Sequence, residues 1–145
     1  MADARISVTI ARPIEEVYAV LTDPEKTPKW SAPAVEEHWT TPGPVAIGSI
    51  RHATTKFMGM RSGNDAELIA FEPNRSWTLK SVSGPPFTVS ATFEPVAGGT
   101  RVDWTWSFAF RGPLKLFEPL ITSFFGRQFA NDLARLKELM ETGAL

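Results

Sequence analysis

Two histidines, at positions 38 and 52, are the side chains best suited to acid–base chemistry near neutral pH. His52 follows Arg51 in a segment that alternates between polar and apolar residues, so it could enter a cavity and act as an acid–base group. It shares a strand face with Lys56, however, so the alternative of a surface position stays open. His38 lies among Glu36, Glu37 and Trp39, where we expect a surface role.

Several other kinds of chemistry find no support. The chain has no cysteine, which excludes thiolate catalysis and disulfides, and its two separated histidines do not form a metal-ligand pattern. Ser62-Gly63 lacks the residues of a nucleophile elbow, and Gly98-Gly99 leads into a predicted strand rather than a phosphate-binding helix. We therefore expect no metal site and no cofactor.

Aromatic residues are the second group that could define a site. The 145 residues include five tryptophans and ten phenylalanines, more than a core of this size requires. This excess is typical of a protein that encloses a ligand cavity. For any single ring, plain core packing is the alternative. The predicted ligand-binding residues are Trp104, Trp106, Trp77, Phe87, Trp30, Phe117, Phe124, Phe125 and, as a partner for an acidic head group, Arg111.

Two kinds of element must position these residues. Between residues 114 and 140, apolar side chains recur every three or four positions, which predicts a long helix from Pro119 to Thr142. Asp132 falls among the positions expected to face water, and Gly126 marks a kink or a close contact. A helix with so broad an apolar stripe needs a large concave partner.

Alternating patterns supply that partner. They predict strands at 5–10, 35–39, 48–57, 65–72, 76–83, 87–94 and 100–110, and turn-forming residues separate the last six of them. In the last two strands, Phe87, Val89, Ala91 and Phe93, and then Val102, Trp104, Trp106, Phe108 and Phe110, occupy one face. Two short helices, after Pro13 and between Asp23 and Trp30, follow the first strand. This order favours a twisted seven-stranded antiparallel sheet wrapped around the C-terminal helix.

The motifs in this order resemble those of START-like proteins (the SRPBCC superfamily) of the polyketide cyclase/dehydrase and lipid-transport type. The segment from Pro13 through Val17, Tyr18, Leu21, Asp23 and Pro24 to Trp30 is similar to the opening of that family. Phe71-Glu72-Pro73 resembles its hairpin turn, Gly98-Gly99-Thr100-Arg101-Val102 its turn into the last strand, and residues 133–141 the end of its final helix. The resemblance implies an α+β helix-grip (Bet v 1-like) fold as a single domain over residues 1–145, with a cavity between sheet and helix.

Two functions compete within this fold. The first is non-catalytic binding or transport of a hydrophobic small molecule, such as a lipid, an isoprenoid or an aromatic metabolite, in the internal cavity. The alternative is an enzyme like the polyketide cyclases or dehydratases, with His52 as acid–base group. A third possibility is a filled cavity and a structural role.

Composition and charge limit the setting. The net charge of −1 gives no electrostatic footprint for nucleic acid or an anionic membrane. No signal peptide or membrane-spanning run is recognisable, so we expect a cytoplasmic protein without integral membrane association. The expected partner is a hydrophobic ligand, and the chain itself is expected to be a monomer or a homodimer.

Overall fold

The computed structural model describes residues 2–57, 59–83, 86–108 and 112–145. One strand, β1 (Ala2–Ile10), precedes two short helices, α1 (Ile14–Leu21) and α2 (Thr27–Trp30). Six strands and two helical segments follow: β2 (Ala34–Trp39), β3 (Ile50–Phe57), β4 (Met60–Glu72), β5 (Ser76–Ser81), β6 (Phe87–Val96), β7 (Gly99–Phe108), the 3-10 helix η1 (Gly112–Phe117) and α3 (Glu118–Glu141).

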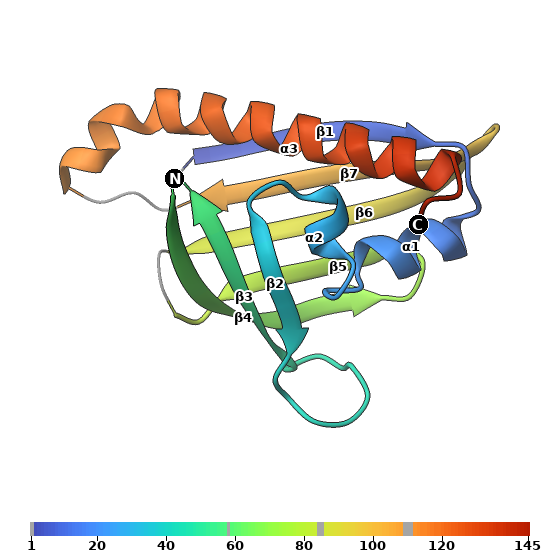
Figure 1. The fold of residues 1–145 in the computed structure, drawn as a ribbon, viewed down its shortest axis with the longest axis horizontal. Helices are drawn as coiled ribbons and strands as arrows, with labels where there is room; N and C mark the ends of the chain where they lie inside the picture. Colours follow the sequence, from blue (N-terminus) through green and yellow to red (C-terminus); the bar gives the residue numbers. More distant parts are fainter. Residues whose placement is uncertain (1, 58, 84–85, 109–111) are drawn as a thin grey trace.

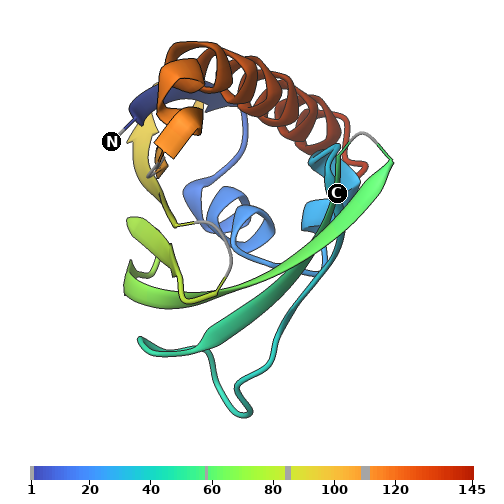
Figure 2. The ribbon, with the colours of Figure 1, turned by 90° about the vertical axis from the view of Figure 1, so that its left-hand side faces the viewer.

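The strands form one seven-stranded antiparallel sheet in the order β1-β7-β6-β5-β4-β3-β2. It curls around α3, and α1 lies across the far end of the curl in the view of Figure 2. The prediction of a helix-grip fold is therefore confirmed. This strand order has a simple physical reason. Strands β2 to β7 follow one another in the chain and pair with their sequence neighbours, and β1 pairs with β7 at the other edge of the sheet.

Strand parity in the last two strands agrees with the sequence pattern. Val89, Ala91 and Phe93 of β6 are buried on the concave face, as are Val102, Trp104 and Trp106 of β7. The cross-strand pairs Val89–Trp106 and Ala91–Trp104 bring large and small side chains together on that face. Phe110, the last position of the predicted stripe, lies outside the described residues.

The fully buried apolar side chains of α3 all lie in its C-terminal half. Leu133, Leu136 and Met140 are buried against the sheet and the short helices, whereas Phe124 is 45% exposed. The first turns of α3 project beyond the start of β1 (Figure 1). The predicted stripe is thus continuous in sequence but only partly buried. Gly126 makes the close approach that its position suggested, since a Cβ atom there would lie 3.8 Å from the Trp106 ring.

Two local predictions were wrong. Strand β4 begins at Met60, not at Asp65, because the positive φ of Gly59 completes the turn and Ser62 and Gly63 then pair with β3. Asp132 is buried, not solvated, because backbone and side-chain donors meet its carboxylate. Among the helices in the described ranges, none is long and apolar enough to cross a bilayer.

Candidate functional site: a cavity between sheet and helix

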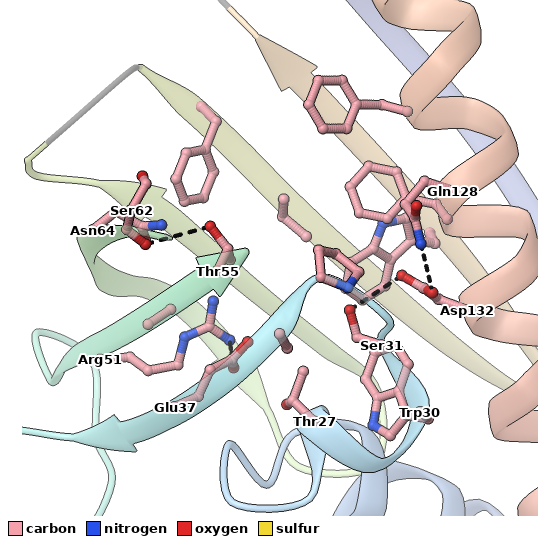
Figure 3. A pocket seen from close by; sticks show the side chains of 18 of the residues that line it. Thr27, Trp30, Ser31, Glu37, Arg51, Thr55, Ser62, Asn64, Gln128 and Asp132 are labelled. Carbon is pink, nitrogen blue, oxygen red and sulfur yellow. Dashed lines mark hydrogen bonds and ion pairs between the residues drawn. The ribbon is translucent and has the colours of Figure 1, made fainter. Parts of the chain in front are cut away.

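A cavity of about 920 Å³ lies between the concave face of the sheet, α2 and α3. Aromatic and aliphatic side chains from the sheet and both helices form most of its wall, as Figure 3 shows. Among them are Leu21, Trp30, Ala53, Trp77, Phe87, Val89, Trp104, Phe108, Phe125 and Phe129. A cavity of this size and composition suits a small molecule of drug-like dimensions.

Trp104 lies at the centre of the aromatic wall. Its ring centroid is 6.1 Å from that of Trp77, 6.3 Å from Trp30 and 5.7 Å from Phe129. The ring nitrogens of all three tryptophans are buried, and none has a hydrogen-bond partner within the described part of the chain. The wall therefore offers aromatic surface at edge-on and tilted angles, which suits a flat or branched apolar ligand.

One polar group in the wall is an ion pair between neighbouring strands. The Arg51 guanidinium of β3 lies 3.1 Å from a carboxylate oxygen of Glu37 of β2, and both side chains are largely buried. Arg51 also lies over the Trp77 ring, 5.6 Å from its centroid. Burial raises the pKa of Glu37, while the Arg51 charge and the Thr27 hydroxyl act to lower it. Burial lowers the pKa of Arg51, against the influence of Glu37.

A second polar group faces the cavity from α3. The carboxylate of Asp132 accepts hydrogen bonds from the Ser31 hydroxyl (3.1 Å), the Ala32 backbone N–H (3.1 Å) and the Gln128 amide (2.9 Å). Among the ion pairs within the described ranges, none includes Asp132. Burial raises its pKa, and the three hydrogen bonds only partly offset this. Asp132 thus ties α3 to the segment that joins α2 and β2, and places an acid in the cavity wall.

This raised pKa predicts a pH effect on stability. A buried acid with a raised pKa binds its proton more tightly in the folded than in the unfolded chain, so its stabilising contribution is full below about pH 4 and is lost as pH rises through the folded-state pKa. Urea unfolding at several pH values should show that the native protein loses stability relative to Asp132→Asn over this range. Parallel pH dependence of the two proteins would contradict the assignment.

The structure brings five of the sequence-predicted ligand residues to the cavity: Trp30, Trp77, Phe87, Trp104 and Phe125. Trp106 points to the same face but is covered, with its ring centroid 4.7 Å from that of Phe129, and it is absent from the lining. Phe117 and Phe124 are exposed at the start of α3. Arg111 lies outside the described residues.

His52 faces away from the cavity. Because side chains alternate along β3, the inward positions of Arg51 and Ala53 place His52 on the convex face. There its Nδ1 lies 2.8 Å from the Asp65 carboxylate, and its ring is 5.6 Å from that of His38. An acid–base role for His52 inside the cavity therefore has no geometric support. Lys56 on the same strand face was the sequence signal for this outward direction.

Two buried acidic residues of the cavity wall, Glu37 and Asp132, were not predicted from the sequence. Glu37 lies in a run of charged residues on the edge strand β2, where a surface position was the simpler interpretation. From the sequence, Asp132 was predicted to face solvent because its side chain is charged. The turn Ser31-Ala32, which supplies two of its three donors, is 100 residues away in sequence, so periodicity along the helix could not reveal it.

A curled antiparallel sheet around a long helix, with an aromatic cavity between them, defines the helix-grip class of fold. Within that class, the chain belongs to the family described as polyketide cyclase/dehydrase and lipid transport, which it matches over residues 1–141. An uncharacterized protein of Mycobacterium tuberculosis is 30% identical over 142 residues, covering 90% of this chain and 81% of its own.

Solved structures share the fold at low sequence identity. A protein of Thermus thermophilus superimposes with a TM-score of 0.83 at 17% identity, with 99% of this chain and all of its own chain covered. The di-domain ARO/CYC protein StfQ of the steffimycin biosynthetic pathway gives a TM-score of 0.79 at 14% identity, with 98% of this chain and 51% of that chain covered. At these identities the similarity establishes the fold only.

Proposed function

We propose that this protein binds or transports a hydrophobic small molecule, such as a lipid, an isoprenoid or an aromatic metabolite, without converting it chemically. The observation that carries this proposal is the cavity of about 920 Å³ with its predominantly apolar wall. The family description, which includes lipid transport, supports it. The expected cytoplasmic location and the oligomeric state stay predictions from sequence.

Partial filling of the cavity should weaken binding. Ala53 is buried in the cavity wall, so Ala53→Phe would place a ring in the space that the ligand needs. We expect affinity for a fluorescent probe with an apolar ring system, such as 1-anilinonaphthalene-8-sulfonate, to fall roughly tenfold or more, because the probe loses contact with about one apolar side chain. Quenching of the three tryptophans in the wall gives a second readout on the same samples.

Thr54→Phe is the matched control. Thr54 is the next residue of the same strand and points to the convex face, so the same added ring leaves the cavity unchanged. Probe affinity should therefore match that of the native protein. Equal affinity in the Ala53→Phe, Thr54→Phe and native proteins would show that the probe binds elsewhere and would remove the main support for the proposal.

One observation favours an enzyme of the cyclase or dehydratase type as second candidate. Three largely buried titratable side chains, Glu37, Arg51 and Asp132, reach the same cavity, and a catalyst needs such convergent groups to hold a chain and move protons. In this form the alternative uses Asp132 or Glu37 in place of His52. Chromatography coupled to mass spectrometry of a compound incubated with the protein separates the two functions. A carrier returns the compound unchanged, a dehydratase returns it lighter by one water, and a cyclase returns either that product or an isomer of equal mass with a different retention time.

A further inference from the structure

The start of the C-terminal helix exposes an unusual group of large apolar side chains. We refer to Leu116, Phe117, Leu120 and Phe124 as the helix-start patch; they are 83%, 53%, 70% and 45% exposed. Their spacing of one, three and four residues places them on one side of η1 and the first turns of α3. Single exposed apolar residues are ordinary, but four neighbouring large ones indicate an interaction surface.

The helix-start patch adjoins the exposed rim of the cavity. Phe124 contacts Phe125, with ring centroids 5.6 Å apart, and Phe125 lines the cavity. On the β3–β4 hairpin, Met60 also lines the cavity although it is 74% exposed. Figure 2 looks onto this end of the molecule, where the start of α3 and the β3–β4 hairpin lie on either side of the curl. Any surface that covers the patch would therefore lie next to the cavity opening.

Basic residues outnumber acidic ones around this opening. Lys56 and Arg61 are directly opposite each other on the β3–β4 hairpin, both exposed, and Arg61 lines the cavity. Like charges in a cross-strand pair destabilise a hairpin unless an anion lies between or beside them. Arg127 follows Phe124 by almost one helical turn and is also exposed. Segments 54–64 and 116–127 hold these three basic residues and one acid, Glu118. The whole-chain charge of −1 hides this local excess.

We propose that the helix-start patch docks on the surface of an anionic lipid bilayer. The apolar side chains would enter the interfacial region, and Lys56, Arg61 and Arg127 would contact lipid phosphates. A second copy of the chain explains the surface less well, because a two-fold symmetric contact through the patch would bring the same basic residues toward one another. The inference goes beyond the proposed function, since docking on a bilayer requires no ligand in the cavity.

Vesicle flotation tests this directly with the full chain. Vesicles of phosphatidylcholine alone are compared with vesicles that contain roughly one third phosphatidylglycerol. We expect binding to the anionic vesicles and little binding to the neutral ones. Leu120→Ser/Phe124→Ser should weaken binding roughly tenfold or more, because two apolar side chains no longer enter the interface. Arg61→Gln and Arg127→Gln should each weaken it roughly fivefold, with a smaller dependence on salt.

Ile47→Ser is the matched control, since Ile47 is 65% exposed but lies in the β2–β3 loop, far from the start of α3 in Figures 1 and 2. It should bind vesicles like the native protein. Equal binding by the patch variant and the Ile47→Ser control would overturn the proposal, as would equal binding to neutral and anionic vesicles. Failure to bind vesicles, combined with dimerisation that Leu120→Ser/Phe124→Ser abolishes, would assign the patch to a second copy instead. Circular dichroism checks that each variant is folded, and none of these readings depends on whether the cavity binds a probe.

Discussion

Replacement of Glu37 by leucine should lower the free energy of unfolding by about 3–5 kcal/mol, because it leaves the buried Arg51 charge without its partner. The side chains of Glu37 and Arg51 are only 7% and 14% exposed, so solvent cannot replace the lost interaction. The Trp77 ring below Arg51 offers a cation–π contact, which is weaker than the ion pair it would have to replace. Urea unfolding followed by tryptophan fluorescence measures the effect.

The double variant Glu37→Leu/Arg51→Met separates the ion pair from the packing around it. Removing both charges removes the cost of burying them, so most of the stability lost in the single variant should return. Glu36→Leu is the control for a charge lost from the same strand, since the Glu36 side chain is 67% exposed, and its effect should be within about 0.5 kcal/mol. A single variant no less stable than the Glu36→Leu control would contradict the assignment of a buried pair.

Gly99→Ala should destabilise the protein by about 3 kcal/mol, at the upper end of what overpacking costs. A Cβ atom at this position would lie 2.1 Å from the carbonyl oxygen of Ile10 and 2.9 Å from the Cα atom of Ala11. Both contacts are backbone atoms at the end of β1, so the new methyl group can be accommodated only if β1 moves away from β7. Thermal and urea unfolding of the variant would show the loss.

Gly98→Ala is the adjacent control. Gly98 has φ of +83° but open space around its Cα hydrogens, so alanine there meets only the backbone cost of a positive φ, about 1 kcal/mol. The two substitutions add the same methyl group to consecutive residues, and their difference isolates the contact with β1. Equal effects at both positions would show that β1 does not approach Gly99 as closely as the structure indicates.

Gly98 and Gly99 show what the sequence could predict and what it could not. The motif Gly98-Gly99-Thr100-Arg101-Val102 could be matched to a family turn from sequence, but its cause is the close passage of β1, nearly ninety residues earlier in the chain. The faces of β6 and β7 could be predicted because their alternation is nearly unbroken. In β3 the pattern mixes apolar, basic and hydroxyl residues, so Lys56 was the one sequence signal for the outward direction of His52, and the sheet was needed to establish it.

The sequence could not predict how deeply each inward-facing side chain is buried, or whether it borders the cavity. Trp104 and Trp106 share a strand face, yet Phe129 covers Trp106 while Trp104 borders the cavity. Similarly, helical periodicity gave one apolar stripe along α3, but the stripe serves three purposes: core packing at Leu133 and Leu136, cavity wall at Phe125 and Phe129, and exposed surface before them. Helical periodicity predicts the side of α3 on which a side chain lies. Whether that side chain meets the core, the cavity or solvent depends on strands that are distant in sequence.

Native mass spectrometry of the freshly purified protein, followed by extraction and identification of bound compounds, tests the central claim most directly. We expect a population heavier than the polypeptide, from which an apolar compound small enough for a cavity of about 920 Å³ is recovered. The Ala53→Phe variant should show less of this population and Thr54→Phe an unchanged amount. A purely unliganded mass, together with failure to take up apolar compounds added in excess, would contradict a ligand-binding cavity.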